Sequence, residues 1–262
     1  MEVVFLGTGG GRWNLISQTR KTGGLRINGS ICIHVDPGPG ALAACHQYGQ
    51  DPQAMQLLVV THNHVDHASD AGVLCEAMSH YALRKQGWLI GSKSVIEGDE
   101  NGDRGISLYH MNSLARVEIA KPGKKIEISI RGKKASLFPT QVKHEDRTGF
   151  GFVLDMDGSC LGYTSDTEYF KGISAQYKGC DVLIAHNLKS HDDGVPGHLF
   201  NAGTARLFSE SEPRLGVLSH MGMRLIKSGP KKAAQEIQLA SGVRTIAAKD
   251  GMKISLGSLR IR

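Results

Sequence analysis

Three histidines and one aspartate lie within six residues of this chain, in the segment T-H-N-H-V-D-H at positions 61–67. The segment directly follows the apolar run Leu57–Val60 and precedes a helical pattern, which places it at the end of a strand. His62 and His64 alternate with an asparagine, so from an extended segment they point the same way. Because buried polar groups need partners, clustered imidazoles beside a carboxylate predict a site for divalent transition metals.

Short β-branched or apolar runs recur along the whole sequence and predict about a dozen strands. They are Val3–Leu6, Ile31–Val35, Leu57–Thr61, Trp88–Gly91, Ile126–Ile130, Ser136–Pro139, Phe150–Leu154, Cys160–Tyr163, Val182–Ala185, Leu215–Ser219, Thr245–Ala248 and Met252–Leu256. Apolar residues at helical spacing predict helices over Ala41–Tyr48, Ala68–Arg84, Tyr169–Gln176, Ala202–Glu210 and Lys231–Ala240. This mixture predicts two sheets with helices on their outer faces. No linker or repeat divides the chain, so residues 1–262 are expected to form a single domain.

The composition is that of a globular protein, with 40% hydrophobic and 21% charged residues. It excludes a disordered chain, a collagen and a small disulfide scaffold. The five cysteines form no C-x-x-C pair, so neither a disulfide framework nor a cysteine zinc site is expected. The opening apolar run is too short for a signal sequence, and no stretch approaches the ~20 residues that span a bilayer. We therefore expect a soluble cytoplasmic protein that does not enter a membrane.

The formal net charge of +6 favours anionic partners. Most of the excess lies in Lys121–Arg147, where eight Lys or Arg stand against three acidic residues. The simpler interpretation of this stretch is a solvated hairpin with basic outer positions. The alternative is a surface that attracts the phosphates of a nucleic acid without regard to sequence.

The pattern H-x-H-x-D-H after an apolar strand resembles the metallo-β-lactamase superfamily of dinuclear metallohydrolases. The resemblance extends over nearly the whole chain, because further matching residues follow in the family's order, each after an apolar strand. It implies an α/β (α+β) fold, the four-layer αββα sandwich, with the metals at one edge of the two sheets.

The resemblance also implies which residues hold the metals. His62, His64 and His144 would hold the first ion, and Asp66, His67 and His220 the second, with Asp166 bridging both. Asp36 is similar to an early aspartate of the family that orients the histidine segment. The ions would be zinc, with manganese or iron as alternatives. Two such ions lower the pKa of a bridging water toward ~7, so that a metal-bridged hydroxide can attack at phosphorus or carbon.

The opening Phe5–Gly10 with Arg12 resembles the start of the ribonuclease Z-like branch, whose members cleave phosphodiesters. Gly197-His198-Leu199-Phe200 resembles the place where these enzymes carry a further histidine outside the metal shell. His198 is therefore the expected general acid for the leaving oxygen, and a helix-capping or surface histidine is the alternative. Ribonuclease Z carries His-Glu where this chain has His186-Asn187, so His186 or Asp192 would have to orient His198 instead.

Only 22 positions separate His144 from Asp166. The tRNA-processing enzymes insert a long arm in this interval, whereas here it has room for two strands and a turn at Asp157-Gly158. The spacing is similar to that of the armless cyclic phosphodiesterases of phosphonate breakdown. The resemblance therefore implies a small or short substrate rather than folded tRNA.

We expect a phosphodiesterase of cyclic or short phosphodiesters, short nucleic acids included. Asp66 and His198 are the expected catalytic residues, and Arg12 and Arg224 the expected substrate-binding ones. One alternative is a ribonuclease Z-type RNA 3′-end endonuclease, whose clamp comes from a partner subunit or the basic hairpin. The others are a metallohydrolase of carbon esters or lactones and a metal-binding protein without catalysis. Armless members of this branch are often dimers, which implies a homodimer.

Overall fold

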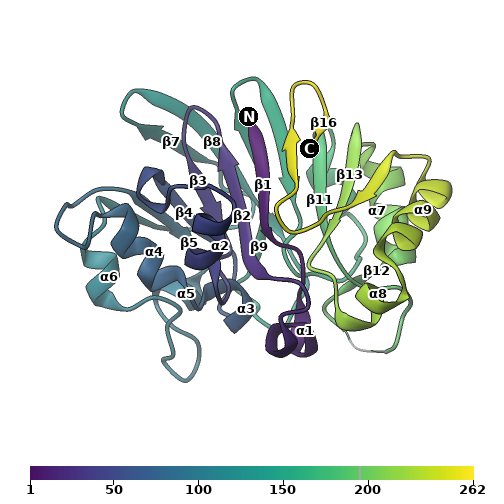
Figure 1. Cartoon of the computed structure of the whole chain (residues 1–262), viewed down its shortest axis with the longest axis horizontal. Helices are drawn as coiled ribbons and strands as arrows, with labels where there is room; N and C mark the ends of the chain where they lie inside the picture. The colour runs from purple at the N-terminus through teal and green to yellow at the C-terminus, as the bar shows by residue number, and fades with distance from the viewer. Residues whose placement is uncertain (195) are drawn as a thin grey trace.

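Two mixed β-sheets face each other in this computed structural model, which describes residues 1–194 and 196–262 (Figure 1). The first sheet has the strand order β16 (Arg260–Ile261), β15 (Lys253–Ser255), β1 (Glu2–Gly7), β2 (Thr22–Asn28), β3 (Ile33–Val35), β4 (Leu57–Val60), β5 (Trp88–Gly91), β6 (Arg116–Ile119). The second has the order β14 (Thr245–Ala247), β13 (Leu215–Ser219), β11 (Val182–Lys189), β10 (Ser159–Tyr163), β9 (Phe150–Met156), β8 (Lys133–Gln141), β7 (Ile126–Ile130). The short strand β12 (Leu199–Phe200) pairs with β11.

Apolar side chains from the inner faces of both sheets form the largest core cluster. Phe5 and Ile27 of the first sheet belong to it together with Phe150 and Phe152 of the second, and all four are buried. Strand β7 shows the period of two that this packing requires, since its three isoleucines are buried and the residues between them exposed. Burial of this apolar surface is the main term that holds the two sheets together.

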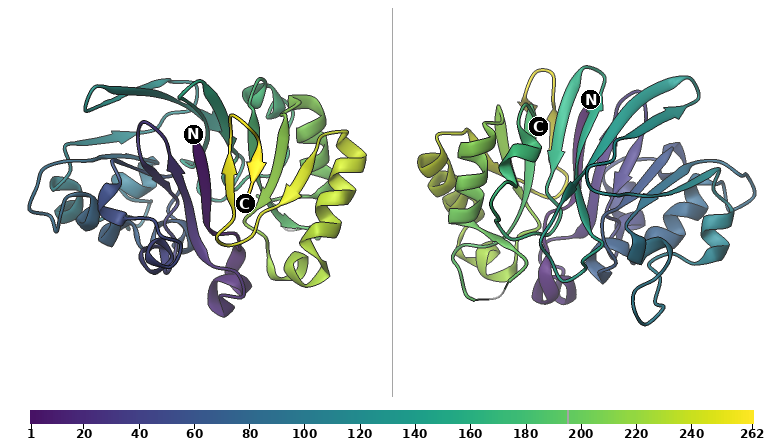
Figure 2. Two further views of the ribbon diagram at one scale, coloured as in Figure 1. Left: turned by 45° about the horizontal axis from the view of Figure 1, so that its top comes forward. Right: turned by 180° about the vertical axis from the view of Figure 1, so that it is seen from behind.

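Helices cover the outer face of each sheet (Figures 1 and 2). On the first sheet lie α2 (Ala41–Gln47), α3 (Val65–Ala68), α4 (Ala71–Met78), α5 (Lys93–Ile96) and α6 (Leu108–Asn112). On the second lie α7 (Asn201–Ser211), α8 (Met223–Ser228) and α9 (Pro230–Ser241). The expected αββα sandwich is confirmed.

One edge of this sandwich collects the loops that follow strands of both sheets. Asp36 follows β3 and His62 follows β4 in the first sheet, while His144, Asp166 and His220 follow β8, β10 and β13 in the second. Helix α1 (Gly11–Ser17) lies beside α3 at the same edge, at the bottom of Figure 1. Residues far apart in the sequence therefore meet there.

The interval between His144 and Asp166 is built as expected. Strands β9 and β10 are antiparallel, and Asp157 and Gly158 between them both have positive φ, 54° and 69°. Two successive positive φ values are typical of a type I′ hairpin turn. The interval therefore contains no arm.

The predicted helix Tyr169–Gln176 is wrong. The structure has only a 3-10 turn at Ser174–Tyr177, and Gly172 takes a φ of +96° that a right-handed helix does not allow. Of the predicted helix Ala68–Arg84, the structure forms α4 at Ala71–Met78, while Ala68 is the last residue of α3. Helix α4 ends early because His80–Ala82 all have positive φ.

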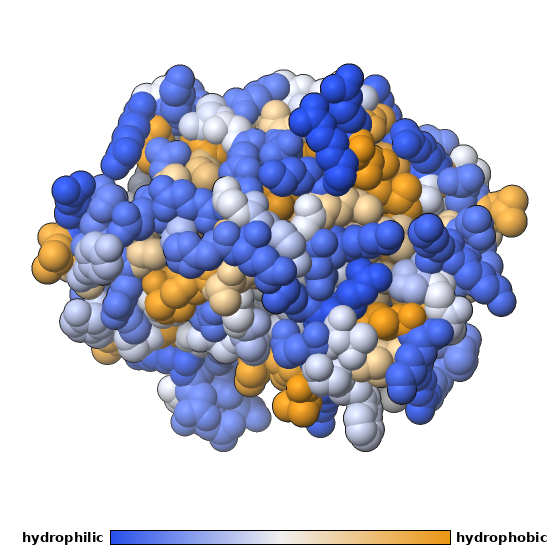
Figure 3. Space-filling model, viewed as in Figure 1, coloured by the Kyte–Doolittle hydropathy of each residue, from blue (hydrophilic) through white to orange (hydrophobic). Residues whose placement is uncertain are grey.

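Hydrophilic side chains cover most of the face in Figure 3, and the apolar ones form small separate groups. Within the described residues, no helix has both the length and the apolar character needed to cross a bilayer.

Candidate metal centre

The first group of candidate ligands consists of His62, His64 and His144. The first two follow β4 directly, and His144 comes from the opposite sheet. His62 Nε2 lies 3.2 Å from His64 Nδ1, and His144 Nε2 lies 3.1 Å from the same atom. Three imidazole nitrogens therefore converge, and neutral imidazole is the commonest metal ligand in proteins.

In two of these rings, the contact of one nitrogen with the protein determines which of the two nitrogens is available to bind a metal. His144 Nδ1 lies 2.9 Å from the carbonyl oxygen of Gly197, and His62 Nδ1 lies 3.2 Å from Thr61 Oγ1. A neutral ring that donates Nδ1–H keeps its lone pair on Nε2, the atom that faces the other histidines. Burial and the nearby His67 hold the pKa of His62 well below its usual value, so this ring is neutral.

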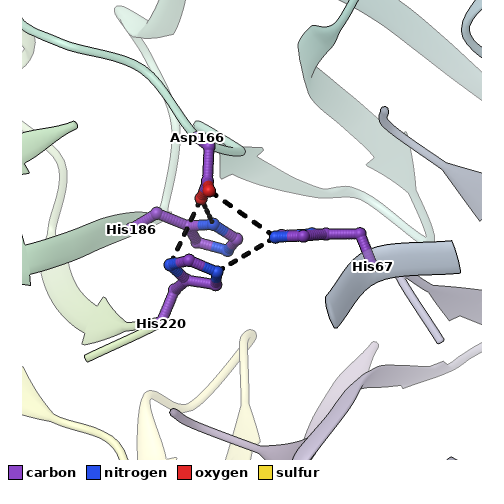
Figure 4. Close-up of side chains that lie close together, drawn as sticks. All are labelled: His67, Asp166, His186 and His220. Atoms are coloured by element: carbon purple, nitrogen blue, oxygen red, sulfur yellow. Dashed lines mark hydrogen bonds and ion pairs between the residues drawn. The ribbon is translucent and has the colours of Figure 1, made fainter. Parts of the chain in front are cut away.

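The second group consists of Asp66, His67 and His220, and it lies beside the first. His67 Nε2 is 3.0 Å from His220 Nε2, which is 3.2 Å from Asp66 Oδ2. Figure 4 shows His67 and His220 pointing toward each other and toward Asp166, although they come from opposite sheets. Both rings are buried.

Asp166 lies between the two groups, in the loop after β10. Its Oδ2 is 3.6 Å from His67 Nε2 and 4.0 Å from His144 Nε2, and its Oδ1 is 3.3 Å from His220 Nδ1. Burial raises the pKa of this carboxyl, but His220 and His67 outweigh that effect and hold the pKa well below its usual range. An ionised carboxylate therefore reaches both groups of histidines.

Asp36 fixes the histidine segment from within the fold. Its carboxylate accepts hydrogen bonds from the Thr61 backbone N–H at 2.7 Å, the Thr61 hydroxyl at 2.8 Å and the Tyr163 hydroxyl at 2.8 Å. It also lies 3.1 Å from His67 Nδ1, which leaves Nε2 of that ring to face the cluster. The position of Asp36 fits the orienting role that the family resemblance implies.

His186 is a neighbour of the second group that sequence reasoning placed only as a supporter. Its Nδ1 lies 2.7 Å from Asp166 Oδ1, and its ring stacks on that of His220 with centroids 4.6 Å apart. Burial lowers the pKa of His186 to about 4, so the neutral ring donates Nδ1–H to Asp166. It therefore orients Asp166.

His198 lies at the outer side of Asp166. Its Nδ1 is 3.6 Å from Asp166 Oδ2, and its ring centroid is 4.9 Å from that of His144. Neither His186 nor Asp192 hydrogen-bonds to it among the described residues, so the expected replacement for the missing glutamate is not seen. Burial, together with His220 and His144, lowers the pKa of His198 to about 4 despite Asp166, so the free protein carries this ring neutral at pH 7.

Two backbone features bring the chain close to this cluster. The Gly11 N–H donates to Asp66 Oδ2 at 3.1 Å, and a Cβ added at Gly10 would lie 2.2 Å from the His220 ring. Ser165 and His220 have φ values of 55° and 53°, which are uncommon for residues other than glycine. Such conformations cost energy and concentrate at functional sites.

The two predicted substrate-binding arginines lie outside the cluster. Arg12 is exposed on α1, one residue after Gly11. The side chain of Arg224 is 82% exposed and lies 3.7 Å from Asp193. The structure places neither guanidinium against the candidate ligands.

The residues fit the divalent metals that the resemblance implies. The carboxyls of Asp36, Asp66 and Asp166 all have lowered pKa values despite burial, because histidines surround them. Burial lowers the pKa of His67, but Asp166 and Asp66 raise it well above its usual value, so the cluster demands positive charge. The buried Nδ1 atom of His220 lies 3.3 Å from Asp166 Oδ1 but makes no hydrogen bond within the described residues. Imidazole with carboxylate is a donor set that suits zinc, manganese and iron.

Sequence reasoning assigned no role to several residues that hold the site. Tyr163 donates to Asp36, and the Gly197 carbonyl orients His144. Asp146 accepts from the Asn63 backbone N–H at 3.0 Å, which ties the histidine segment to the loop after His144. These contacts join segments that are distant in sequence, so the sequence pattern around each residue does not indicate them. Tyr163 does lie at the end of a strand, but a tyrosine at that position is not specific to any role.

The sequence matches the model of a family described as a beta-lactamase superfamily domain over residues 32–221. It is also 34% identical to an uncharacterized protein of Methanocaldococcus jannaschii, over 98% of this chain and 95% of that protein.

Three solved structures share the fold. The metallo-beta-lactamase fold protein YhfI from Bacillus subtilis superposes with a TM-score of 0.76 at 18% identity, covering 96% of this chain and 98% of that one. The short form of human tRNase Z gives a TM-score of 0.67 at 16% identity, covering 98% and 99%. A diphosphatase of the PhnP family gives 0.67 at 15% identity, covering 97% of each chain.

Proposed function

This chain belongs to the beta-lactamase superfamily, and from that membership we propose that it is a metal-dependent phosphodiesterase acting on cyclic or short phosphodiesters. The observation that carries the proposal is the position of Asp166, whose carboxylate reaches the histidines of both groups. A carboxylate between two sets of ligands could be shared by two divalent ions, and such a pair stabilises the attacking and leaving oxygens of a displacement at phosphorus.

We assign the ligands as the family resemblance implies, and the proximity of these side chains supports the assignment. His62, His64 and His144 would hold one ion, zinc by preference, and Asp66, His67 and His220 the other, with Asp166 shared. Two divalent ions there supply positive charge for a phosphodiester and lower the pKa of water. Asp36 and His186 set the orientation of His67 and Asp166.

His198 is assigned as the group that delivers a proton to the leaving oxygen. It lies beside Asp166 and is not one of the ligands that the resemblance implies, and its side chain is 17% exposed, so a substrate can reach it. The pKa of about 4 in the free protein means that the ring needs a nearby anion to become protonated. A phosphodiester carries that negative charge, which raises the pKa of an adjacent imidazole.

A short phosphodiester is favoured over tRNA by the interval between His144 and Asp166. Strands β9 and β10 and their two-residue turn fill it, which leaves no clamp for a folded RNA. The diphosphatase of the PhnP family shares this fold at nearly full length. Carbon esters and lactones are the competing substrates, because the same metals can activate water for attack at carbon.

A ribonuclease Z-type activity on RNA is the second candidate. It is favoured by the fold shared with human tRNase Z and by the eight Lys and Arg of Lys121–Arg147, all of which are exposed. Such a surface attracts phosphates and makes binding salt-dependent.

The ligand assignment is tested by comparing His64→Ala and Asp66→Ala with His198→Ala, using the exposed His46→Ala as the matched control. We expect the first two to abolish turnover of bis(p-nitrophenyl) phosphate and to lower bound metal, measured by elemental analysis. His198→Ala should keep its metal. Nitrophenolate leaves without a proton, so the turnover rate of His198→Ala should fall little with bis(p-nitrophenyl) phosphate. With a substrate whose leaving group is a nucleoside, the rate of this variant should fall about 10²–10⁴-fold.

A loss of metal in His198→Ala as large as in His64→Ala would contradict the role of His198. Parallel assays with a p-nitrophenyl carbon ester and a lactone test the substrate class. Faster turnover of either one than of the diester, with zinc or manganese added, would contradict the phosphodiesterase proposal.

A further inference from the structure

A cavity of about 500 Å³ opens beside the candidate metal centre, and His198 forms part of its wall. Phe200, Ala202, Gly203 and Arg206, from β12 and α7, line it together with Tyr169 from the loop after Asp166. Its volume lies within the range of small-molecule sites. Because His198 also lies beside Asp166, the cavity adjoins the reacting centre on the side of the proposed acid.

The wall is apolar and aromatic where α7 approaches the loop. A Cβ added at Gly203 would lie 3.2 Å from Tyr169 Cβ and 3.4 Å from a methyl carbon of Leu199, so this glycine lets the helix come close. Phe200 is half-buried. The Arg206 guanidinium lies over the Tyr169 ring, 4.7 Å from its centroid. Flat surfaces of this kind favour a ring in the ligand.

Two charged side chains of the described wall, Arg206 and Glu168, are already paired. Arg206 Nε donates to Glu210 at 2.9 Å. Glu168 accepts from Lys143 Nζ at 2.7 Å and from the Gly197 N–H at 3.1 Å. Asp192 adds an exposed carboxylate at the rim. Among the wall residues described, no cation lacks a carboxylate partner, and the rim is acidic. A ligand with a further phosphate would therefore be repelled at the rim and would find no unpaired cation in the described wall.

We propose that this cavity holds the leaving group of the phosphodiester and that this group is an uncharged alcohol carrying a flat ring, such as a nucleoside. The assignment rests on the proposed function, because the group protonated by His198 must lie on the His198 side of the phosphorus. This assignment restricts the expected substrates to phosphodiesters whose leaving group carries no second phosphate.

Ala202→Trp tests the cavity directly, and Ser209→Trp on the same helix is its control. Both positions are exposed, so neither substitution disturbs the core, and only Ala202 lines the cavity. In ethyl p-nitrophenyl phosphate, the leaving group is aromatic and the group that stays on phosphorus is a small ethyl ester. With this substrate we expect Ala202→Trp to lower kcat/KM about tenfold and Ser209→Trp to leave it within about twofold. Equal effects of the two variants would overturn the proposal.

The charge of the leaving group is tested with the dinucleotide ApU and its 3′-phosphorylated form ApUp. If uridine leaves, the cavity accepts it, whereas uridine 3′-phosphate meets the acidic rim. We expect kcat/KM for ApU to exceed that for ApUp about tenfold. A preference for ApUp would overturn the assignment of an uncharged leaving group.

A binding measurement separates this inference from the proposed function. Saturation-transfer NMR with uridine and the metal-free protein should show contact, which Ala202→Trp weakens and Ser209→Trp does not. Uridine binding without turnover of any diester would support the cavity as a nucleoside-binding site and refute the proposed phosphodiesterase activity. Turnover of diesters with no uridine contact would refute the cavity alone.

Discussion

At the scale of single residues, Gly10 shows how closely the chain surrounds the second group of ligands. A Cβ at this position would lie 2.2 Å from the His220 ring, and the Gly10 N–H donates to the Met221 carbonyl at 3.0 Å. The backbone therefore has little freedom to move away. His220 itself has a positive φ, so its ring position depends on this packing.

We predict that Gly10→Ala displaces His220 and weakens metal binding roughly 10–100-fold, the range seen when the support of a ligand is removed. Equilibrium dialysis against zinc measures this affinity. Gly257→Ala is the control, because a Cβ there meets no atom within 4 Å. Equal zinc affinities of the two variants would show that Gly10 does not position His220.

The residues alone pointed to the four candidate ligands of the histidine segment, the family resemblance added His144, Asp166 and His220, and most of the side chains that support them had no signal in the sequence. The H-x-H-x-D-H pattern concentrates four of them in one segment, and the others each follow an apolar strand. Tyr163 and Gly197 act through single atoms that the fold brings to Asp36 and His144. A lone tyrosine or a backbone carbonyl has no local signature, so only the folded chain identifies these roles.

At the scale of elements, β8 separates the basic hairpin tip from the metal centre. The strand has nine residues, which at about 3.3 Å per residue places its first residue roughly 26 Å from its last. Lys133 and Lys134 lie at the start, and His144 follows the end. Figure 1 shows the β7–β8 hairpin at the edge of the molecule opposite to α1 and α3.

We therefore predict that Lys133→Ala combined with Lys134→Ala leaves kcat/KM for bis(p-nitrophenyl) phosphate within about twofold, because screening at physiological salt removes most charge effects beyond ~8 Å. Under the ribonuclease Z-type candidate function, the same change should weaken RNA binding and reduce its salt dependence. Filter binding over a salt series measures this. A large loss of diester turnover would show that the hairpin acts on the site.

The twelve strands predicted from apolar runs are all present, and the described residues contain four more, β2, β6, β12 and β16. The T-G-G start of β2 lacks β-forming residues, and β12 and β16 have two residues each. Strand β6 is only four residues long, and two of its residues are charged. The false helix at Tyr169–Gln176 arose from apolar spacing alone. Tyr169 instead donates to Glu210 of α7 at 2.8 Å, a contact from outside the segment that no helical period predicts.

At the scale of the whole molecule, the site exists because two sheets end at one edge. The segments that follow β3 and β4 of one sheet and β8, β10 and β13 of the other each bring a candidate residue to that edge. The pattern of strands and helices predicted two sheets with helices outside, and the family resemblance implied this sandwich. The cavity beside His198 could not be predicted, because it depends on how α7 packs against the loop after Asp166.

The most direct test of a dinuclear centre is a titration of the metal-free protein with zinc, with bis(p-nitrophenyl) phosphate turnover followed at each addition. The two groups of ligands around Asp166 predict that turnover rises until two equivalents of zinc are bound and is then constant. Full turnover at one equivalent, or two bound equivalents without diester turnover, would contradict the assignment of this chain as a dinuclear phosphodiesterase.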